Sequence, residues 1–446
     1  MKKSTLRFMS VALSAATAFT FAGFSAPTTT KAAETAVAIN EANFPDEYFR
    51  NAVSTNLDTN KNGSLDPEEA AVVTDFNVYN YGWGEDDPYF FVDEYGGYLS
   101  LYNCSNCTGI EYFTNASYVY LYNINDTKFD FSGMSNLSWL TIDWAYNLES
   151  VDVTGLEDLY SITITHCDSI KSLDVSTNKN INYVSCAGNA NFSTFKTGNN
   201  NKSLSSVYVY GPSVKSLDLS KLSALTDLAI NDCNLNINKL GIKNKNKITT
   251  LCINNNKKSG FVPSEFKNLT YLEYENNGAK SIDLSKNKKL SYVDVRDNSL
   301  KKIDVSKQKD LWFLDVSNNK LGSLDVSKNK DLGTLYATGN VFKKLDLTKN
   351  KYLGSLNINY NPLLTTIDAS KCTSLYYVSI DYDATMKLPS GTYTYSYYDY
   401  SKEDTVKKKL KGSSVNGEKL DLKGEYVTFV NKKKAELYIY FSYMYW

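Results

Sequence analysis

The stretch Leu290-Ser-Tyr-Val293-Asp-Val295-Arg-Asp-Asn298-Ser-Leu300 sets apolar residues in a fixed frame that ends on an asparagine and a further leucine. The frame, L-x-x-L-x-L-x-x-N-x-L, returns at residues 311–321 and, with small changes, at 332–340 and 353–363. Its asparagine recurs every 21 residues, as Asn256, Asn277, Asn298, Asn319, Asn340 and Asn361. A fixed period of this length is the sequence signature of a repeat architecture, so the chain is predicted to be a solenoid.

The frame continues towards the N-terminus with looser spacing. Residues 378–383 also extend it once more after Asn361, and Phe76-Asn-Val78 is interpreted as a degenerate first turn. The repeats are therefore predicted to fill residues 73–385. Upstream, the asparagine position is held at intervals of 20 to 23 residues by Cys233, Pro212, Asn189, Cys167, Ala145, Ile124 and Cys104.

The physical basis of the frame is the alternation of side chains along a strand. In L-x-L the flanking residues point into the core and x points outward. One short strand cannot bury its apolar face unaided, so the coils stack and their strands pair in parallel. The asparagine follows the strand, where its amide can donate to and accept from the backbone of adjacent coils.

This frame resembles that of the leucine-rich-repeat family, specifically the short bacterial subtype typified by internalins and related secreted Firmicute proteins, over roughly residues 70–385. The resemblance implies an α/β-type repeat, a solenoid with a curved parallel β-sheet and a mostly irregular or short-helical convex side. Cysteine is the accepted substitute for asparagine in that frame, so Cys104, Cys167 and Cys233 are interpreted as structural. Cys186 falls on a core position, and a zinc site at Cys104-x-x-Cys107 is disfavoured for want of further ligands.

A second motif marks the opposite side of each coil. It consists of an apolar residue, an aspartate, another apolar residue and then Ser or Thr. We interpret it as turn chemistry, in which the carboxylate accepts local backbone N–H groups; calcium bound between stacked aspartates is the disfavoured alternative. The aspartates are Asp130, Asp152, Asp174, Asp218, Asp283, Asp304, Asp325, Asp346 and Asp368.

Residues 39–72 form a different unit, predicted to be a small helical N-terminal cap. Helical spacing at Phe49, Val53 and Leu57 leads into a loop with every position of the 12-residue EF-hand pattern, with Gly63 at its sharp turn. No second loop is found, so Leu65 must pack elsewhere, and the unit resembles the EF-hand-like cap of internalins. We predict weak, structural Ca²⁺ binding by Asp58, Asn60, Asn62, Ser64 (through its backbone carbonyl), Asp66 and Glu69.

The two ends of the chain lie outside the repeats. Residues 1–33 have a basic start and an apolar, alanine-rich middle, which predicts a signal peptide and a secreted or cell-surface bacterial protein with no later transmembrane segment. Residues 386–446 are predicted to be a β-rich C-terminal cap or hairpin, with strands at 427–430 and 437–441. An attachment module is the alternative for this segment.

Composition argues against catalysis and for binding. The single histidine, His166, excludes most His-dependent active sites and is interpreted as structural, and the carboxylates are expected in turns and loops and not as a converging pair. Charge is unevenly distributed: residues 34–170 hold 23 acidic and 3 basic residues, and residues 171–446 hold 26 acidic and 41 basic. Such a dipole can orient a charged partner, although charge that merely keeps the repeat surface soluble is the simpler interpretation.

The outward positions of the predicted sheet are rich in aromatic residues. Large aromatic rings on an open sheet predict a non-catalytic protein that binds a macromolecule outside the cell, most simply another protein, as an adhesin does. The protein is expected to be a monomer. A glycan- or cell-wall-binding structural component is the alternative; no nucleic-acid partner is expected, and strand propensity can also account for some of these rings. The predicted contact residues are Tyr98, Tyr102, Tyr118, Tyr120, Tyr122, Trp139, Tyr208, Tyr210, Tyr271, Tyr292, Phe313 and Tyr336.

Overall fold

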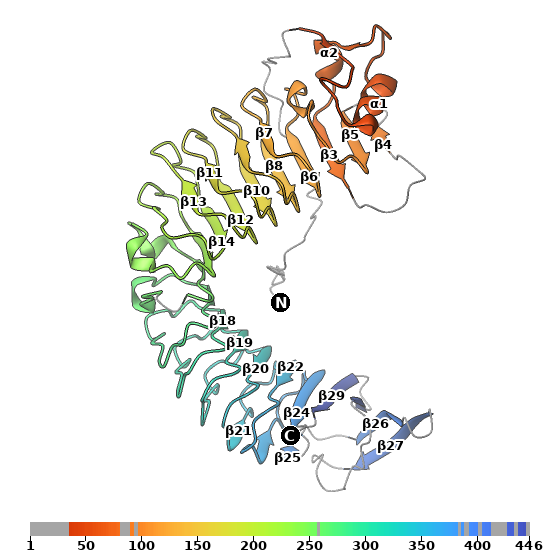
Figure 1. Ribbon diagram of the computed structural model, residues 1–446. Coiled ribbons are helices and arrows are strands. Elements are labelled where there is room, and N and C mark those ends of the chain that lie inside the picture. The colour runs from red at the N-terminus through yellow and green to blue at the C-terminus, as the bar shows by residue number, and fades with distance from the viewer. Residues whose placement is uncertain are drawn as a thin grey trace, which may run out of the picture.

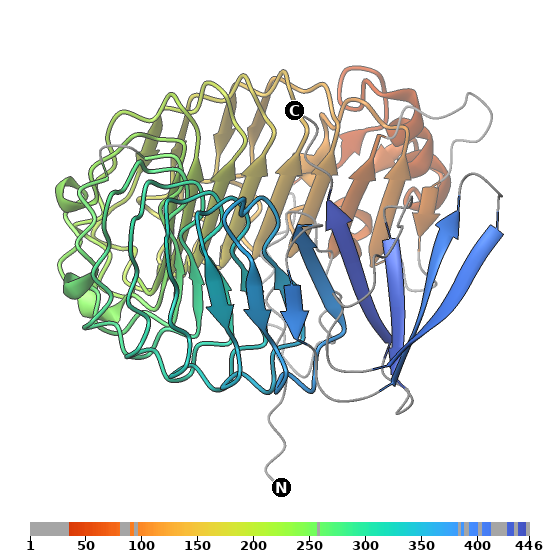
Figure 2. The same ribbon diagram turned by 90° about the horizontal axis from the view of Figure 1, so that it is seen from below.

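The protein is an arched solenoid of short stacked strands (Figure 1), seen from below in Figure 2. The computed structural model describes residues 35–80, 90–92, 97–256, 259–381, 385–387, 392–399, 404–411, 426–431 and 436–442. The predicted signal peptide lies outside these residues and stays a prediction. No helix among the described residues has the length and apolar character needed to cross a membrane.

A parallel sheet lines the concave side of the arch and confirms the predicted leucine-rich-repeat solenoid. Adjacent strands pair in register, so that Val293 of one coil lies beside Leu314 of the next, and both are fully buried. The strands are β3 (Asp75–Tyr79), β5 (Tyr98–Tyr102), β6 (Tyr118–Tyr122), β8 (Trp139–Asp143), β10 (Ser161–Thr165), β12 (Tyr183–Ala187), β14 (Ser206–Tyr210), β15 (Asp227–Asn231), β16 (Thr250–Cys252), β17 (Tyr271–Glu273), β18 (Tyr292–Asp294), β19 (Phe313–Asp315), β20 (Thr334–Tyr336), β22 (Ser355–Asn357) and β24 (Tyr377–Asp381).

The first coils do not stack in sequence order, and the interpretation of residues 76–78 as the first turn of the stack is wrong. Strand β3 lies between β5 and β6, and β4 (Phe90–Val92) pairs antiparallel on the far side of β5. Phe76 is thereby enclosed, with its ring 5.4 Å from Phe49 of the cap and 5.6 Å from Phe113. This aromatic cluster places β3 in the interior of the sheet.

The asparagine that follows each strand works as predicted. The amide nitrogen of Asn319 donates to the carbonyl oxygen of Val295 in the preceding coil at 3.0 Å, and its oxygen accepts from the N–H of Leu300 at 2.9 Å. Where cysteine takes this place, the thiol of Cys167 donates to the Thr165 carbonyl oxygen at 3.2 Å. All seven cysteines are free and buried, so they pack as structural residues.

A second row of buried amides, which was not predicted, runs along the convex side. Asn329 is fully buried and donates to the carbonyl oxygens of Val305 at 2.9 Å and Gln308 at 2.6 Å. Each such amide links its coil to the coil before it, so the stack is held together along two parallel lines. The members of this row are Asn178, Asn201, Asn287, Gln308, Asn329 and Asn350.

The aspartates of the convex motif form turns, as predicted. Asp325 accepts a hydrogen bond from the N–H of Ser327 at 2.9 Å, and the bonds from Ser327 hold the pKa of that carboxyl below its usual value. The other eight predicted aspartates accept the same bond two residues on. Beside irregular segments, the convex side also has short strands: β7 (Lys128–Asp130), β9 (Ser150–Asp152), β11 (Ser172–Asp174), β13 (Thr194–Lys196), β21 (Lys344–Asp346), β23 (Thr366–Asp368) and β25 (Thr385–Lys387).

Short helices complete the convex side and the N-terminal cap. Helix α1 (Glu47–Asn56) begins directly after Asp46, whose side chain caps it by accepting from the backbone N–H groups of Tyr48 and Phe49. Strand β1 (Val37–Ala38) pairs antiparallel with β2 (Ser64–Leu65), which gives Leu65 the strand partner that a second EF-hand loop would otherwise supply. The remaining helices are α2 (Pro67–Ala70) and the 3₁₀ turns η1 (Ile110–Tyr112), η2 (Ile237–Lys239), η3 (Lys245–Lys247) and η4 (Pro263–Glu265).

A second, antiparallel set of strands forms the predicted β-rich C-terminal cap. Its strands are β26 (Thr392–Asp399), β27 (Asp404–Lys411), β28 (Tyr426–Asn431) and β29 (Glu436–Ser442). Strands β28 and β29 form the expected hairpin pairing, and β29 also pairs in parallel with β24. The last strand of the cap therefore continues the solenoid sheet and covers its C-terminal edge (Figure 2).

Candidate functional sites on the concave sheet and the N-terminal loop

The predicted contact residues all occupy outward positions of the concave sheet, and each is at least partly exposed. They do not form one continuous patch. Near the N-terminal end, Tyr98 and Tyr118 lie on either side of Asp75 of β3, and Trp139 of β8 pairs with Tyr118. Tyr208 and Tyr210 lie further along, both on β14, and a third group begins at β17.

Near the N-terminal end, the sheet carries closely packed tyrosines. The ring of Tyr79 lies 5.5 Å from that of Tyr102 and 5.2 Å from that of Tyr120. Tyr79 was not predicted, since its strand was thought to end the stack. Exposed Trp139 lies 5.2 Å from exposed Tyr160, a second residue missed because it precedes its strand by one position.

The C-terminal half carries an aromatic stack. Tyr271 and Tyr292 lie face to face with ring centroids 4.1 Å apart, and Phe313 continues the stack at 4.2 Å with an interplanar angle of 2°. Trp312, which is 46% exposed, packs edge-on against Tyr292 at 6.0 Å, and Tyr336 packs edge-on against Phe313 at 5.7 Å. We call the rings of Tyr271, Tyr292, Phe313 and Trp312 the aromatic wall.

A row of carboxylates runs beside this wall, which corrects the expectation that the carboxylates do not converge. Glu273, Asp294 and Asp315 occupy the next outward position of β17, β18 and β19 and pair in register. The signal was present in the sequence, because Asp294 and Asp315 each occupy the outward position x of L-x-L. We call Glu273, Asp294 and Asp315 the carboxylate row.

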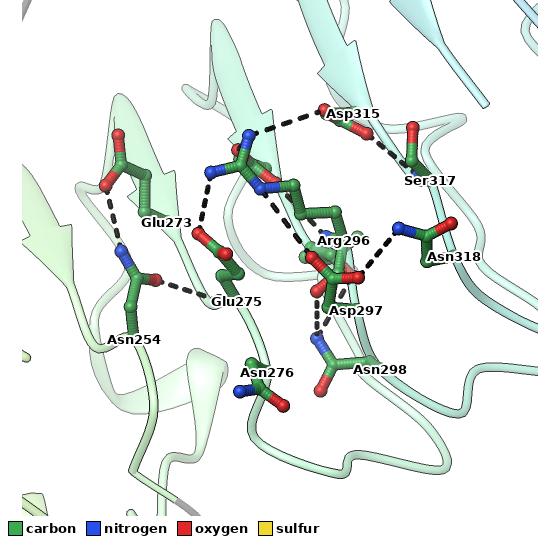
Figure 3. Close-up of polar contacts among 12 residues, drawn as sticks. Asn254, Glu273, Glu275, Asn276, Arg296, Asp297, Asn298, Asp315, Ser317 and Asn318 are labelled. Atoms are coloured by element: carbon green, nitrogen blue, oxygen red, sulfur yellow. Dashed lines mark hydrogen bonds and ion pairs between the residues drawn. The ribbon is translucent and has the colours of Figure 1, made fainter. Parts of the chain in front are cut away.

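One arginine lies among these acids (Figure 3). Arg296 donates to Glu275 at 2.8 Å, whereas its nitrogens lie 3.6 Å from the Asp294 carboxylate and 4.0 Å from that of Asp315. Asp294 and Asp315 are each only 4% exposed. Burial, reinforced by the charge of Asp315, raises the pKa of Asp294 to about 7. Burial also raises the pKa of Asp315.

In the N-terminal loop, the predicted ligands bond to the loop itself. Asp58 accepts from the N–H groups of Asn62 and Gly63, both at 3.0 Å, and Gly63 has the positive φ of 78° that the turn requires. Glu69 accepts from the N–H of Thr59 at 2.7 Å and from the N–H of Asp66 at 3.0 Å. Burial opposes ionisation of Glu69, but these hydrogen bonds outweigh it and lower its pKa.

The chemistry of this loop fits a hard cation, although its present geometry is not that of a formed site. Within the described ranges, no three His, Cys, Asp or Glu side chains are placed to hold a metal ion. Asn60 and Asn62 both turn their amide nitrogens to Asp66, at 2.6 and 2.8 Å, and a flip of each amide would bring its oxygen there. The donor set would then consist entirely of oxygens, as Ca²⁺ requires.

His166 is held between two neighbours where β10 ends. Its Nδ1 lies 2.9 Å from the carboxylate of Asp143, and the ring stacks on Trp144 with centroids 4.5 Å apart. A Cβ on Gly188 would lie 2.9 Å from the imidazole, so the next coil also closes on the ring. These contacts account for the histidine as a packing residue of the stack.

No protein-family model matches the chain, and no curated protein is significantly similar to it. The solved structures that match include the functional domain of InlJ from Listeria monocytogenes, which includes a cysteine ladder, at 17% identity and a TM-score of 0.47, over 93% of this chain and 100% of that one. A leucine-rich-repeat protein of Leptospira interrogans matches at 13% identity and a TM-score of 0.35, over 62% of this chain and 87% of that one. Values this low carry no argument about function, and the fold rests on the strand register and amide ladders of this chain.

Proposed function

We propose that the protein is a non-catalytic, exported bacterial protein, internalin-like in its repeats, that binds a macromolecular partner on its concave sheet. The observation that carries the proposal is the aromatic wall, whose rings stack in register along consecutive strands and stay partly exposed. Parallel sheets are ordinarily covered on both faces, and repeat proteins use such open concave faces for recognition. Since strands repeat about every 4.8 Å, the face is long enough for a macromolecule.

A protein partner is the first choice. Tyrosine combines a large rigid apolar surface with a hydroxyl group, which is the composition of protein interfaces. The hydroxyls of Tyr208 and Tyr210 are protonated at neutral pH, like those of other tyrosines, and can donate hydrogen bonds to a partner.

A glycan is the second candidate, favoured by one pair of residues. Trp139 and Tyr160 are 41% and 42% exposed and lie side by side on adjacent coils. Exposed aromatic faces of this kind also suit stacking against sugar rings. A glycan array probed with the purified chain, run beside capture of bacterial and host surface proteins, distinguishes the two candidates.

The test of the concave face uses matched aromatic substitutions. Replacing Tyr292 and Phe313 of the aromatic wall, together with Tyr118, Tyr120, Tyr208 and Tyr210, by serine is expected to abolish capture of the partner, while circular dichroism keeps the spectrum of the folded solenoid. The control replaces Tyr146 and Tyr352 by serine; these residues are 47% and 52% exposed and lie in loops outside the strands. Capture that survives the first set, or is lost equally with the control set, overturns the proposal.

Calcium is proposed as a structural ligand of the N-terminal loop. Asp58, Asp66 and Glu69 would supply the charged oxygens, with Asn60, Asn62 and the carbonyl of Ser64 completing the set. Three charged ligands favour weak binding, with a dissociation constant on the order of 10⁻⁴–10⁻³ M. Loading of the loop would hold α1 and α2 together on the first coils.

A further inference from the structure

The coils that carry the aromatic wall also carry an excess of negative charge. Glu273, Glu275, Asp294, Asp297 and Asp315 lie close together, and Arg296 is the cation found among them (Figure 3). Among the described residues of the C-terminal half this is a local reversal, because residues 171–446 hold 41 basic and 26 acidic residues overall. The charge that a partner meets therefore depends on which face of the protein it approaches.

The carboxylate row is incompletely neutralised. Arg296 donates a hydrogen bond of 2.8 Å to Glu275, and its nitrogens lie no closer than 3.6 Å to the carboxylate of Asp294 and 4.0 Å to that of Asp315. Both aspartates accept a backbone N–H two residues on, at 3.1 and 2.8 Å, which satisfies one oxygen of each. A buried carboxylate is costly without a closely paired charge, so an incoming cation would add to the partial pairing that Arg296 provides.

The aromatic wall lies next to the row at a useful distance. Along one strand, Tyr292 and Asp294 are alternate residues on the same face, about 6.6 Å apart, and Phe313 and Asp315 repeat the arrangement on the next strand. Lysine and arginine have an apolar stem and a charged end. Such a side chain can lie along the rings of Tyr292 and Phe313 and reach the carboxylates with its charge.

The outer side of the same coils has the opposite sign. Exposed lysines recur every 21 residues in its turns, as Lys286, Lys307, Lys328 and Lys349. A cationic partner is repelled by that side and attracted to the concave one, which orients its approach.

We propose that the aromatic wall and carboxylate row together bind a basic segment of a polypeptide, with lysine or arginine at alternate positions of an extended chain. In an extended segment, alternate side chains repeat about every 6.6 Å on one side, and their flexible stems allow two neighbouring cations to reach carboxylates that are spread over about 9.6 Å across three adjacent strands. The proposal rests on the proposed function and names the chemistry of its partner.

Binding by a defined probe tests this directly. The probe is a short fluorescent peptide of alternating lysine and serine, and its counterpart has glutamate in place of lysine. Fluorescence anisotropy is expected to detect the lysine peptide alone, with affinity that falls as salt is added. Replacing Asp294 and Asp315 by asparagine is expected to weaken binding at least about tenfold, because both charges that face the cations are removed.

A matched control makes the same change in net charge on the convex side of the coils. Asp304→Asn with Asp325→Asn alters two exposed turn aspartates and is expected to leave affinity for the lysine peptide unchanged. Equal loss in the control, no loss in Asp294→Asn with Asp315→Asn, or equal binding of the glutamate peptide overturns the proposal. Equal affinity for spermine, which has the cations without a peptide chain, replaces the polypeptide by a small polyamine and also overturns it.

The two proposals fail in distinguishable ways. If the aromatic substitutions abolish partner capture while the Asp294 and Asp315 substitutions leave both capture and peptide affinity intact, the concave face binds its partner without the carboxylate row. If neither set alters capture, the concave face itself is not the binding surface.

Discussion

The negative charge of Asp294, which the proposed binding uses, lowers the stability of the folded protein. Its pKa is raised to about 7 by burial and by the neighbouring charge of Asp315, from an unfolded value of 3.8. The folded protein therefore binds this proton more tightly than the unfolded chain, so stability falls as pH rises from about 4 to about 7. Asp315 on β19 and Glu273 on β17 supply this repulsion, and Arg296 opposes it.

Asp294→Asn is therefore expected to stabilise the protein at pH 8, by an amount on the order of a few kcal/mol, and to change little near pH 4. The asparagine can keep the hydrogen bond from the N–H of Arg296. Urea unfolding at the two pH values measures the difference. Asp325→Asn is the control, since the bonds from Ser327 lower its pKa and no gain at pH 8 is expected. An equal gain in the free energy of unfolding at both pH values would contradict the raised pKa of Asp294.

The buried amide of Asn319 links two coils. Asn319→Ala leaves the carbonyl oxygen of Val295 and the N–H of Leu300 without this partner, and it is expected to lower the free energy of unfolding by at least about 2 kcal/mol. Lys320→Ala, an exposed neighbour, is expected to change it by less than about 0.5 kcal/mol. Chemical denaturation of both variants provides the comparison, and equal values would contradict a structural role for the ladder.

At the level of elements, sequence periodicity predicted what repeats and missed what departs from the repeat. The 21-residue frame predicted the strands and the amide of Asn319, because both depend on local spacing. The placement of β3 between β5 and β6 could not be predicted in this way, since it depends on the contact of Phe76 with Phe49 across the cap boundary. The convex amide of Asn329 was missed because the convex motif that begins at Asp325 was interpreted as turn chemistry alone.

The N-terminal loop provides a prediction for the cap. Millimolar Ca²⁺ is expected to raise the melting temperature, because a ligand that binds the folded state alone stabilises it by mass action. Glu69→Gln should remove this rise, since it deletes one charged ligand, and it should also lower the melting temperature without Ca²⁺ by weakening the bonds to Thr59. Glu68→Gln, at an exposed position beside it, should keep the rise.

Comparison of the changes in melting temperature on addition of Ca²⁺ shows whether the ion binds at this loop. Scanning calorimetry of the wild type with and without Ca²⁺ comes first, and no rise at millimolar Ca²⁺ reduces the loop to a plain cap. A rise that persists in Glu69→Gln means that the ion binds elsewhere. The lowered pKa of Glu69 adds a pH dependence, because stability held by its carboxylate is present above the unfolded pKa of about 4.5 and is lost as pH falls through the folded value.

On the scale of the whole molecule, the solenoid needs both of its ends covered. Each coil contacts its neighbours, so an uncovered end presents a row of unpaired backbone groups to other chains. The edge strand of the repeats, β24, is paired with β29 from residue 377 to residue 381, which joins the C-terminal strands to the stack. The cap therefore has a structural task that does not depend on its composition.

Breaking this pairing is expected to turn the protein into a self-associating one. Ile439→Pro removes a backbone N–H from the middle of β29, opposite Val378, and proline is excluded from interior strands. Light scattering after size-exclusion chromatography should show oligomers that grow with concentration. Lys408→Pro in β27, which pairs with β26 and not with β24, is the control and should leave the chain monomeric. A monomeric Ile439→Pro variant with unchanged melting would show that the coils end stably without this strand, and the C-terminal segment would then be free for a role in attachment.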